Sequence, residues 1–171
     1  MPSDVLVVID AQHVFADVEG PWGSPMFADV LPAIEAAVRE YADRVVFTRY
    51  VAPDDPAGAW TAYFARWPFA LTAPDHPQYR LVPQFAGRPT VDATTFGKWG
   101  DPLRAALGDA RSVQLCGVST DCCVLSTALP MADAGIAVTV RAQACAGSSP
   151  EAHENALAAM ELYAPLITVA R

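Results

Sequence analysis

The alternation of short, β-branched apolar runs with longer alanine-rich or amphipathic segments constrains the fold of this chain more than any other feature. Runs that are apolar throughout are typical of strands covered on both faces, and helices commonly connect such strands. The rhythm therefore predicts βαβ units that build a parallel sheet. No repeat or linker divides the 171 residues, so we expect a single domain over residues 1–171.

The same pattern predicts six strands and five helices. The strands are expected at Val5–Ile9, Arg44–Thr48, Val91–Thr94, Val113–Cys116, Ala137–Val140 and Ile167–Val169. The helices are expected at Val30–Ala42, Ala57–Ala65, Pro102–Leu107, Cys122–Ala134 and Pro150–Tyr163. Asp101 and Ser149 should be N-caps, because each precedes a proline suited to the first helical position.

Charge and cysteine content exclude several partners and locations. Nineteen acidic and eleven basic residues give a net charge of −8, so we expect neither nucleic acid nor a membrane as partner. The segment Met1–Asp4 carries no basic region or cleavage site of a leader. Four cysteines, two of them adjacent, do not form a spaced disulfide framework. We therefore expect a cytoplasmic protein.

The stretch Ala52–Pro89 departs from the strand-helix rhythm, because it is rich in proline and aromatic residues. Its aromatic residues include Trp60, Tyr63, Phe64, Trp67, Phe69 and Tyr79. Long segments of this kind serve as lids or binding walls, and a patch packed against a neighbouring subunit explains the composition equally well. Because the insertion is large for so short a chain to bury, we expect a homo-oligomer, at least a dimer.

Ligands of open parallel sheets bind at the carboxyl ends of the strands, where two polar residues draw attention. Asp10 ends the first expected strand, and Gln12 follows it without the glycine-rich turn that a dinucleotide needs. Lys98 follows the third expected strand between Gly97 and Trp99, a setting that can desolvate and aim its amine. A structural carboxylate and a solvated lysine remain the alternatives for these two residues.

The segment Leu115–Val124 carries the strongest functional pattern, because an expected buried strand ends there in a tight turn and a helix begins. A cysteine in the first helical turn lies near unpaired amide N–H groups and the positive end of the helix dipole, which favour thiolate over thiol. Such a thiolate should react fast with iodoacetamide near neutral pH. The same amides can receive the oxyanion of a tetrahedral intermediate. Cys116 and Cys145 are interpreted as small buried hydrophobic residues.

With these residues, the chain resembles the isochorismatase-like cysteine hydrolases, which include nicotinamidases and N-carbamoylsarcosine amidases, over nearly its whole length. The segment Asp10-Ala-Gln12, with Phe15, is similar to the family's first-strand Asp-x-Gln. Phe96–Lys98 is similar to its lysine segment, and Cys116–Val124 to its Gly-Val-x-Thr-Asp-x-Cys-Val signature. Gln143–Ala146 resembles the Asp-Ala-Cys-Ala segment that follows the fifth strand.

The resemblance implies a three-layer α/β/α fold with a mostly parallel, six-stranded, Rossmann-like sheet, and a catalytic triad of Asp10, Lys98 and Cys123. Asp10 would take the thiol proton, Lys98 would stabilise the thiolate and hold Asp10 ionised, and Cys123 would attack the carbonyl carbon. The backbone N–H groups of Ser119 and Cys123 would hold the oxyanion. The resemblance also implies a cis peptide between Val118 and Ser119.

Two departures limit what the resemblance carries over. The zinc-binding nicotinamidases place an Asp-x-His after the second strand, where this chain reads Thr48-Arg49-Tyr50-Val51, so we expect no metal. The three histidines, at positions 13, 76 and 153, are scattered and are interpreted as surface or supporting residues without a catalytic role.

The resulting expectation is a cysteine hydrolase that cleaves an amide-type C–N bond of a small molecule through a thioester, without a cofactor. The family's spacing places Cys123 toward the pocket and Cys122 at a variable position with a small packed side chain. A vinyl-ether hydrolase acting on isochorismate is the alternative within the fold, although such members characteristically lack the cysteine. A non-catalytic binding or assembly module and a thiol redox protein are alternatives from other classes.

Gln12 and four aromatic residues are the candidates for substrate binding. The aromatic candidates are Phe15, Trp22, Trp60 and Trp99. With Trp67, they would form an aromatic-walled pocket suited to a flat or apolar acyl group, and aromatic core packing is the alternative interpretation. The sequence does not name the substrate.

Overall fold

A six-stranded, all-parallel sheet forms the centre of the protein, whose computed structural model describes residues 5–171. The strands are β1 (Val5–Ile9), β2 (Val45–Tyr50), β3 (Thr90–Ala93), β4 (Ser112–Val118), β5 (Ala137–Ala146) and β6 (Ile167–Ala170), in the order β3-β2-β1-β4-β5-β6. The predicted fold class is confirmed. The segment Met1–Asp4, expected to lack a leader, lies outside the described residues.

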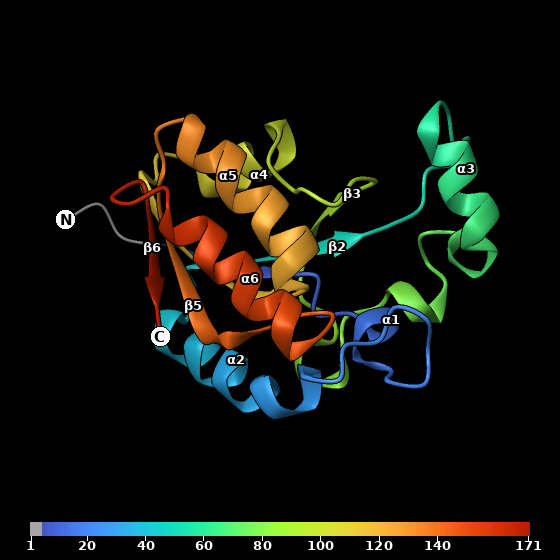
Figure 1. Ribbon diagram of the computed structural model, residues 1–171, viewed down its shortest axis with the longest axis horizontal. Helices are drawn as coiled ribbons and strands as arrows, with labels where there is room; N and C mark the ends of the chain where they lie inside the picture. The colour runs from blue at the N-terminus through green and yellow to red at the C-terminus, as the bar shows by residue number, and fades with distance from the viewer. Residues whose placement is uncertain (1–4) are drawn as a thin grey trace.

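Helices cover both faces of this sheet (Figure 1). On one face, α2 (Phe27–Tyr41) packs against β1 and β5. On the other face, α5 (Leu125–Asp133) and α6 (Pro150–Glu161) pack against β5 and β6, with α4 (Asp101–Leu107) near α5. The remaining helices, α1 (His13–Ala16) and α3 (Ala59–Arg66), lie beyond the ends of β1 and β2, and α3 stands apart from the others. None of the helices within residues 5–171 has the length and apolar character needed to span a bilayer.

The strand order reverses beside β1, because the chain adds β2 and β3 on one side of it and β4, β5 and β6 on the other. A reversal of this kind opens a crevice at the carboxyl ends of the two strands that flank it, here β1 and β4. Leu6–Ile9 of β1 are fully buried, so the strand at the centre of the crevice is also the centre of the core. The fold therefore places the residues that follow β1 and β4 side by side.

Strand β5 runs much further than its apolar pattern predicts. The apolar run of β5 ends at Val140, yet the strand continues to Ala146 because its later residues still pair with β4. The pairing resumes at Gly117 with Cys145, after an irregularity between Leu115 and Gly117. Backbone pairing does not need apolar side chains, so a local hydrophobic pattern underestimates such strands.

The starts of three helices test the capping assignments. Ser149 is the N-cap of α6 as predicted, since its Oγ accepts a hydrogen bond from the Ala152 N–H at 3.0 Å. The prediction for Asp101 is wrong, because α4 begins at Asp101 itself and Gly100 precedes it without a side-chain cap. The helix expected from residue 122 begins earlier, with a wide π turn over Thr120–Val124 that leads into α5. The peptide between Val118 and Ser119 is cis, as the resemblance implies.

The segment that departs from the strand-helix rhythm contains α3 and three short 3-10 turns. These turns are Pro68–Ala70, Pro77–Tyr79 and Pro83–Phe85, and each begins with a proline. Proline suits the first position of a helical turn, and its missing N–H prevents a turn from extending back toward the N-terminus. The segment therefore follows an irregular path beyond β2 and returns to β3.

Candidate active site

Three side chains from separate segments meet at the crevice. Asp10 directly follows β1, Cys123 lies in the π turn that follows β4, and Lys98 lies in the loop between β3 and α4. Lys98 Nζ lies 2.9 Å from Asp10 Oδ2, and both side chains are fully buried. Cys123 is 3% exposed, and its thiol lies within hydrogen-bonding reach of the Asp10 carboxylate. The structure thus brings the three predicted triad residues together.

The Lys98 ammonium has oxygen atoms on three sides. Besides its ion pair with Asp10, Nζ donates hydrogen bonds to the carbonyl oxygens of Thr95 at 2.7 Å and Phe96 at 2.9 Å. Asp10 Oδ2 faces this ammonium, and the Cys123 thiol lies within hydrogen-bonding reach of the same carboxylate. Lys98 therefore supplies a fixed positive charge, while Asp10 can still accept a proton.

Two buried threonines, which the sequence analysis did not select, hold these groups in place. Thr48 Oγ1 donates to Asp10 Oδ1 at 2.7 Å and lies 3.2 Å from the Asp10 N–H, from which it accepts. Thr127 Oγ1 accepts from the Lys98 N–H at 2.9 Å and donates to the Cys123 carbonyl oxygen at 2.7 Å. Spacing could have identified Thr127, since residues four apart on a helix share a face.

The turn that carries the cysteines depends on close approach between β1 and β4. A Cβ on Gly117, whose φ is +118°, would lie 2.1 Å from the Ile9 carbonyl oxygen, so only glycine fits there. The Ser119 carbonyl oxygen then accepts from the amides of Cys122 at 3.1 Å and Val124 at 3.0 Å. This turn buries Cys123 and leaves Cys122 exposed.

The protonation state of Cys123 differs from the expectation. Burial, with the negative charge of Asp10, raises the pKa of the Cys123 thiol well above its ordinary range, and the Lys98 charge opposes this only in part. Complete desolvation thus opposes the thiolate that the first helical turn is expected to favour, and the labelling experiment below decides between them. Cys123 is a thiol at neutral pH, and its proton must leave during the reaction.

We expect iodoacetamide to label the protein slowly at neutral pH, first at Cys122 and not at Cys123. Burial raises the pKa of both thiols, so the reactive thiolate is scarce at neutral pH and becomes more abundant as the pH rises. Peptide mapping after labelling at about pH 7 and about pH 9 measures this order. Fast modification of Cys123 at the lower pH would contradict this order and would show that Cys123 is a thiolate in the free protein.

A cavity of about 200 Å³ lies beside Cys123. Its aromatic wall consists of Phe15, Trp22, Tyr50, Tyr63 and Phe96. Its polar lining includes Ser119, Cys122, Cys123 and Ser148. The cavity is therefore narrow and mostly aromatic, with the nucleophile candidate at its polar side. Of the predicted substrate contacts, Phe15 and Trp22 lie in this wall.

Gln12 lies outside the cavity lining, because its side chain is fully used inside the protein. Nε2 donates to the carbonyl oxygens of Tyr50 and Tyr79, both at 2.8 Å, and Oε1 accepts from the Tyr50 N–H at 2.8 Å. These bonds satisfy the amide group and join β1 to β2 and to the irregular segment. Gln12 thus supports the cavity wall and does not face a ligand.

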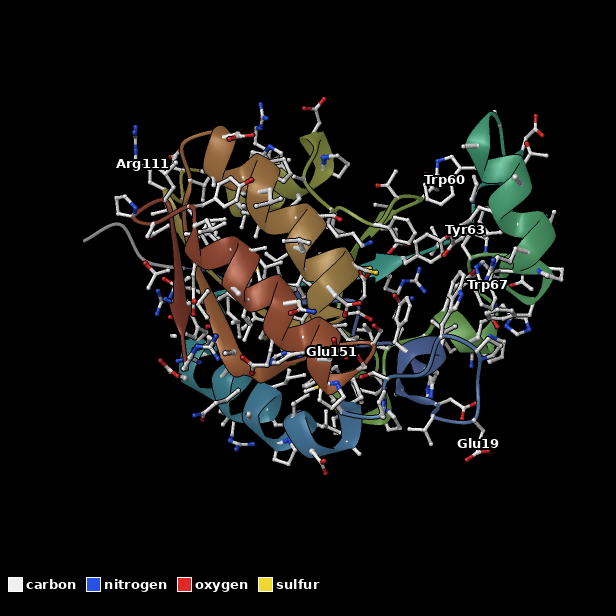
Figure 2. The ribbon with its side chains drawn as sticks, in the orientation of Figure 1. Glu19, Trp60, Tyr63, Trp67, Arg111 and Glu151 are labelled. Carbon is white, nitrogen blue, oxygen red and sulfur yellow. The ribbon has the colours of Figure 1, made fainter. Side chains whose placement is uncertain are left out.

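Trp60 and Trp99 also lie outside the lining. Figure 2 shows Trp60 and Tyr63 on the side of α3 that faces the rest of the protein. Trp60 packs behind the wall, with its ring centroid 5.2 Å from that of Tyr63 and 5.5 Å from that of Phe96. Trp99 instead lies under the Arg104 guanidinium, 4.9 Å from its ring centroid. The irregular segment supplies a binding wall through Tyr63, and its predicted role at a subunit interface stays a prediction.

His153 is the one histidine close to the cysteine turn among residues 5–171. It is buried on α6, and its Nδ1 lies 2.8 Å from Thr120 Oγ1. Burial lowers the pKa of His153, so the ring is neutral at pH 7 and helps hold the turn. His13 and His76 are exposed, and the absence of a catalytic role for the histidines stays a prediction.

Comparison of the sequence with known proteins identifies one family. The model described as "Isochorismatase domain" matches residues 4–171. Isochorismatase domain-containing protein 2 of Xenopus laevis is 38% identical over 63 residues, which cover 37% of this chain and 31% of that protein. The match thus spans about a third of the curated relative.

Solved structures with the same fold cover the whole chain. An isochorismatase-like hydrolase from Alkaliphilus metalliredigens has a TM-score of 0.82 at 18% identity. The alignment covers 98% of this chain and 93% of the hydrolase. A pyrazinamidase of Pyrococcus horikoshii in complex with zinc has a TM-score of 0.78 at 22% identity and covers 99% of both chains. The nicotinamidase of Bacillus subtilis has a TM-score of 0.76 at 23% identity and covers 100% of both. These likenesses concern the fold.

Proposed function

Since the chain belongs to the isochorismatase-like hydrolase family, we propose that it is a cysteine hydrolase that cleaves an amide-type carbon–nitrogen bond of a small molecule. The observation that carries this proposal is the Cys123 thiol, which lies against the Asp10 carboxylate beside the aromatic cavity. Lys98 fixes that carboxylate from the other side at 2.9 Å. A nucleophile, a base and an orienting group in contact are the parts that covalent catalysis needs.

In the first half-reaction, Asp10 takes the proton of the Cys123 thiol while Sγ attacks the carbonyl carbon of the bound amide. The electron pair of the carbonyl bond moves to oxygen, and we place this oxyanion against the backbone N–H groups of Ser119 and Cys123. The C–N bond then breaks as the leaving nitrogen takes the proton from Asp10. Ammonia or an amine departs, and the acyl group remains on Cys123 as a thioester.

In the second half-reaction, Asp10 removes a proton from water while the water oxygen attacks the thioester carbon. The C–S bond breaks, and the sulfur recovers its proton from Asp10. The carboxylic acid leaves and the resting thiol is restored, so the cycle consumes one water and no cofactor. Lys98 keeps its charge throughout and stabilises the transient thiolate.

We expect at least one compound in a panel of primary amides, ureides and lactams to release ammonia or acid in the presence of the protein. Acid quenching during turnover should leave an acyl group on the peptide that contains Cys123, detectable by mass spectrometry. Turnover of isochorismate without an adduct would indicate a vinyl-ether hydrolase instead. Failure of every compound, with no adduct, would favour a binding module and contradict the proposal.

The same assay tests the proposal that no metal takes part. The segment Thr48–Val51 lacks the Asp-x-His of zinc-dependent relatives, and no group of three or more His, Cys, Asp or Glu side chains within residues 5–171 could hold a metal ion. Turnover should therefore survive dialysis against EDTA. Loss of turnover that zinc restores would contradict this proposal.

We further propose that the protein is a cytoplasmic homo-oligomer. All four cysteines are free, which suits a reducing compartment. Leu71 and Phe96, on or beside the aromatic segment, expose a third or more of their surface. Contact with a second copy of the chain would bury these apolar side chains.

A further inference from the structure

The hydroxyl group of Tyr50 is buried and makes no hydrogen bond within residues 5–171. Tyr50 ends β2, is 2% exposed and lines the cavity that also contains Cys123. Buried hydroxyl groups without a partner are rare, because removing them from water costs free energy and no hydrogen bond in the protein compensates for that cost. An unpaired hydroxyl on a residue that lines a cavity therefore points to a partner that the cavity binds.

Neighbouring groups hold the Tyr50 ring in this position. The Tyr50 backbone is bonded through both N–H and carbonyl to the Gln12 side chain, at 2.8 Å each. The ring packs edge-on against Trp22 and Tyr79, with centroids 5.8 and 5.9 Å away. The Lys98 ammonium lies 5.5 Å from its centroid. The hydroxyl is therefore pre-positioned at the cavity.

Tyr50 keeps its proton at neutral pH. Burial raises the pKa of the phenol above its ordinary range, and the neighbouring Tyr79, Tyr63, Cys123 and Asp10 raise it further. A neutral phenol has one O–H to donate, whereas a phenolate would have none. The unpaired Tyr50 hydroxyl can therefore donate a hydrogen bond to an acceptor on a ligand.

The strand order separates this donor from the oxyanion site. Tyr50 comes from β2 and Ser119 follows β4, on opposite sides of β1. Two strand spacings amount to roughly 10 Å between their backbones. A carbonyl held by the Ser119 and Cys123 amides therefore leaves the Tyr50 hydroxyl, which comes from another strand, for a different acceptor atom of the same molecule.

The cavity volume limits what that acyl group can be. An apolar cavity of about 150 Å³ takes up benzene, and the cavity here has about 200 Å³. A single ring with a carboxamide, or a flat group of similar size, fits this volume. Phe15 and Trp22, which are stacked at 8° between planes, form a flat wall for it.

We propose that Tyr50 is a specificity-determining residue whose hydroxyl donates a hydrogen bond to an acceptor atom on the acyl group of a small, flat amide. The acceptor is an atom other than the carbonyl oxygen of the bond that is cleaved. This inference rests on the proposed function for the position of that bond, but the binding it describes does not require turnover.

Binding to the Cys123→Ala variant tests the inference without hydrolysis. The probes are benzamide and the three pyridinecarboxamides, which differ from it only by a ring nitrogen placed at each position in turn. Calorimetry should show at least one isomer binding about tenfold more tightly than benzamide. Adding Tyr50→Phe should erase this preference and leave benzamide binding unchanged. Equal binding of all four probes, or a preference that survives Tyr50→Phe, would overturn the inference.

Tyr79→Phe is the matched control, because the Tyr79 hydroxyl is also buried but donates to the Ala70 carbonyl oxygen outside the cavity lining. It should lower the unfolding midpoint and leave the isomer preference intact. Tyr50→Phe should not lower the midpoint, since its hydroxyl has no bond to lose. An equal drop in both variants would assign the Tyr50 hydroxyl a structural role and overturn the inference.

Turnover separates this inference from the proposed function. If the wild-type protein hydrolyses no amide while Cys123→Ala shows a Tyr50-dependent preference, the proposed function fails and the binding role of Tyr50 is supported. If amides are hydrolysed and the preference does not depend on Tyr50, the inference alone fails.

Discussion

Cys123→Ala is expected to abolish hydrolysis of any amide that the wild-type protein turns over, with a loss in kcat on the order of 10⁴-fold or more. The substitution removes the atom that forms the thioester, so the covalent route disappears. The fold should persist, because deleting one buried sulfur costs on the order of 1 kcal/mol. Steady-state kinetics and thermal unfolding of the same preparation measure the two effects.

Cys122→Ala is the matched control, since it removes the same atom one residue earlier. We expected a packed side chain here, but Cys122 is exposed, with Sγ 4.0 Å from Asp121 Oδ2. Its loss should leave the unfolding midpoint nearly unchanged and alter KM more than kcat, because Cys122 lines the cavity. A dead Cys122→Ala together with an active Cys123→Ala would show that the assignment is one residue out of register.

Breaking the buried ion pair is expected to lower stability and activity together. Lys98→Met leaves the Asp10 carboxylate buried without its cation, which should cost about 3–5 kcal/mol of unfolding free energy. Asp10→Asn leaves the ammonium with two carbonyl partners only and also removes the base, so kcat should fall by about 10²–10⁴-fold. Denaturant unfolding and steady-state kinetics measure these losses.

The double variant, Asp10→Asn with Lys98→Met, distinguishes the structural role of the pair from its chemical role. Removing both charges should restore much of the stability that either single variant loses, since no uncompensated charge remains buried. Activity should stay as low as in Asp10→Asn, because the base is still missing. Single variants as stable as the wild type would show that the pair is not desolvated as the structure describes.

The fold could be predicted from the sequence because its signals are local. A buried parallel strand such as β1 must be apolar throughout, so Val5–Ile9 was assigned to its observed bounds. Ser149 was identified as a cap because the serine and the proline after it act on adjacent residues. The errors arose where backbone pairing replaced side-chain pattern, as at the end of β5, or where a turn was wider than an α-helix, as at Thr120–Val124.

Motifs in the sequence are enough to select the residues for the proposed chemistry, because Asp10, Lys98 and Cys123 each follow a strand in a recognisable motif. The burial of the Cys123 thiol and the groups that face the triad follow from the packing of the whole chain. Desolvation adds up over every atom around a group, so the raised pKa of Cys123 could not be inferred from its helix terminus. The positions of Tyr50 and Ser119 on the two sides of β1 likewise depend on strand order. Strand order brings together residues far apart in the chain, so no local sequence pattern predicts it.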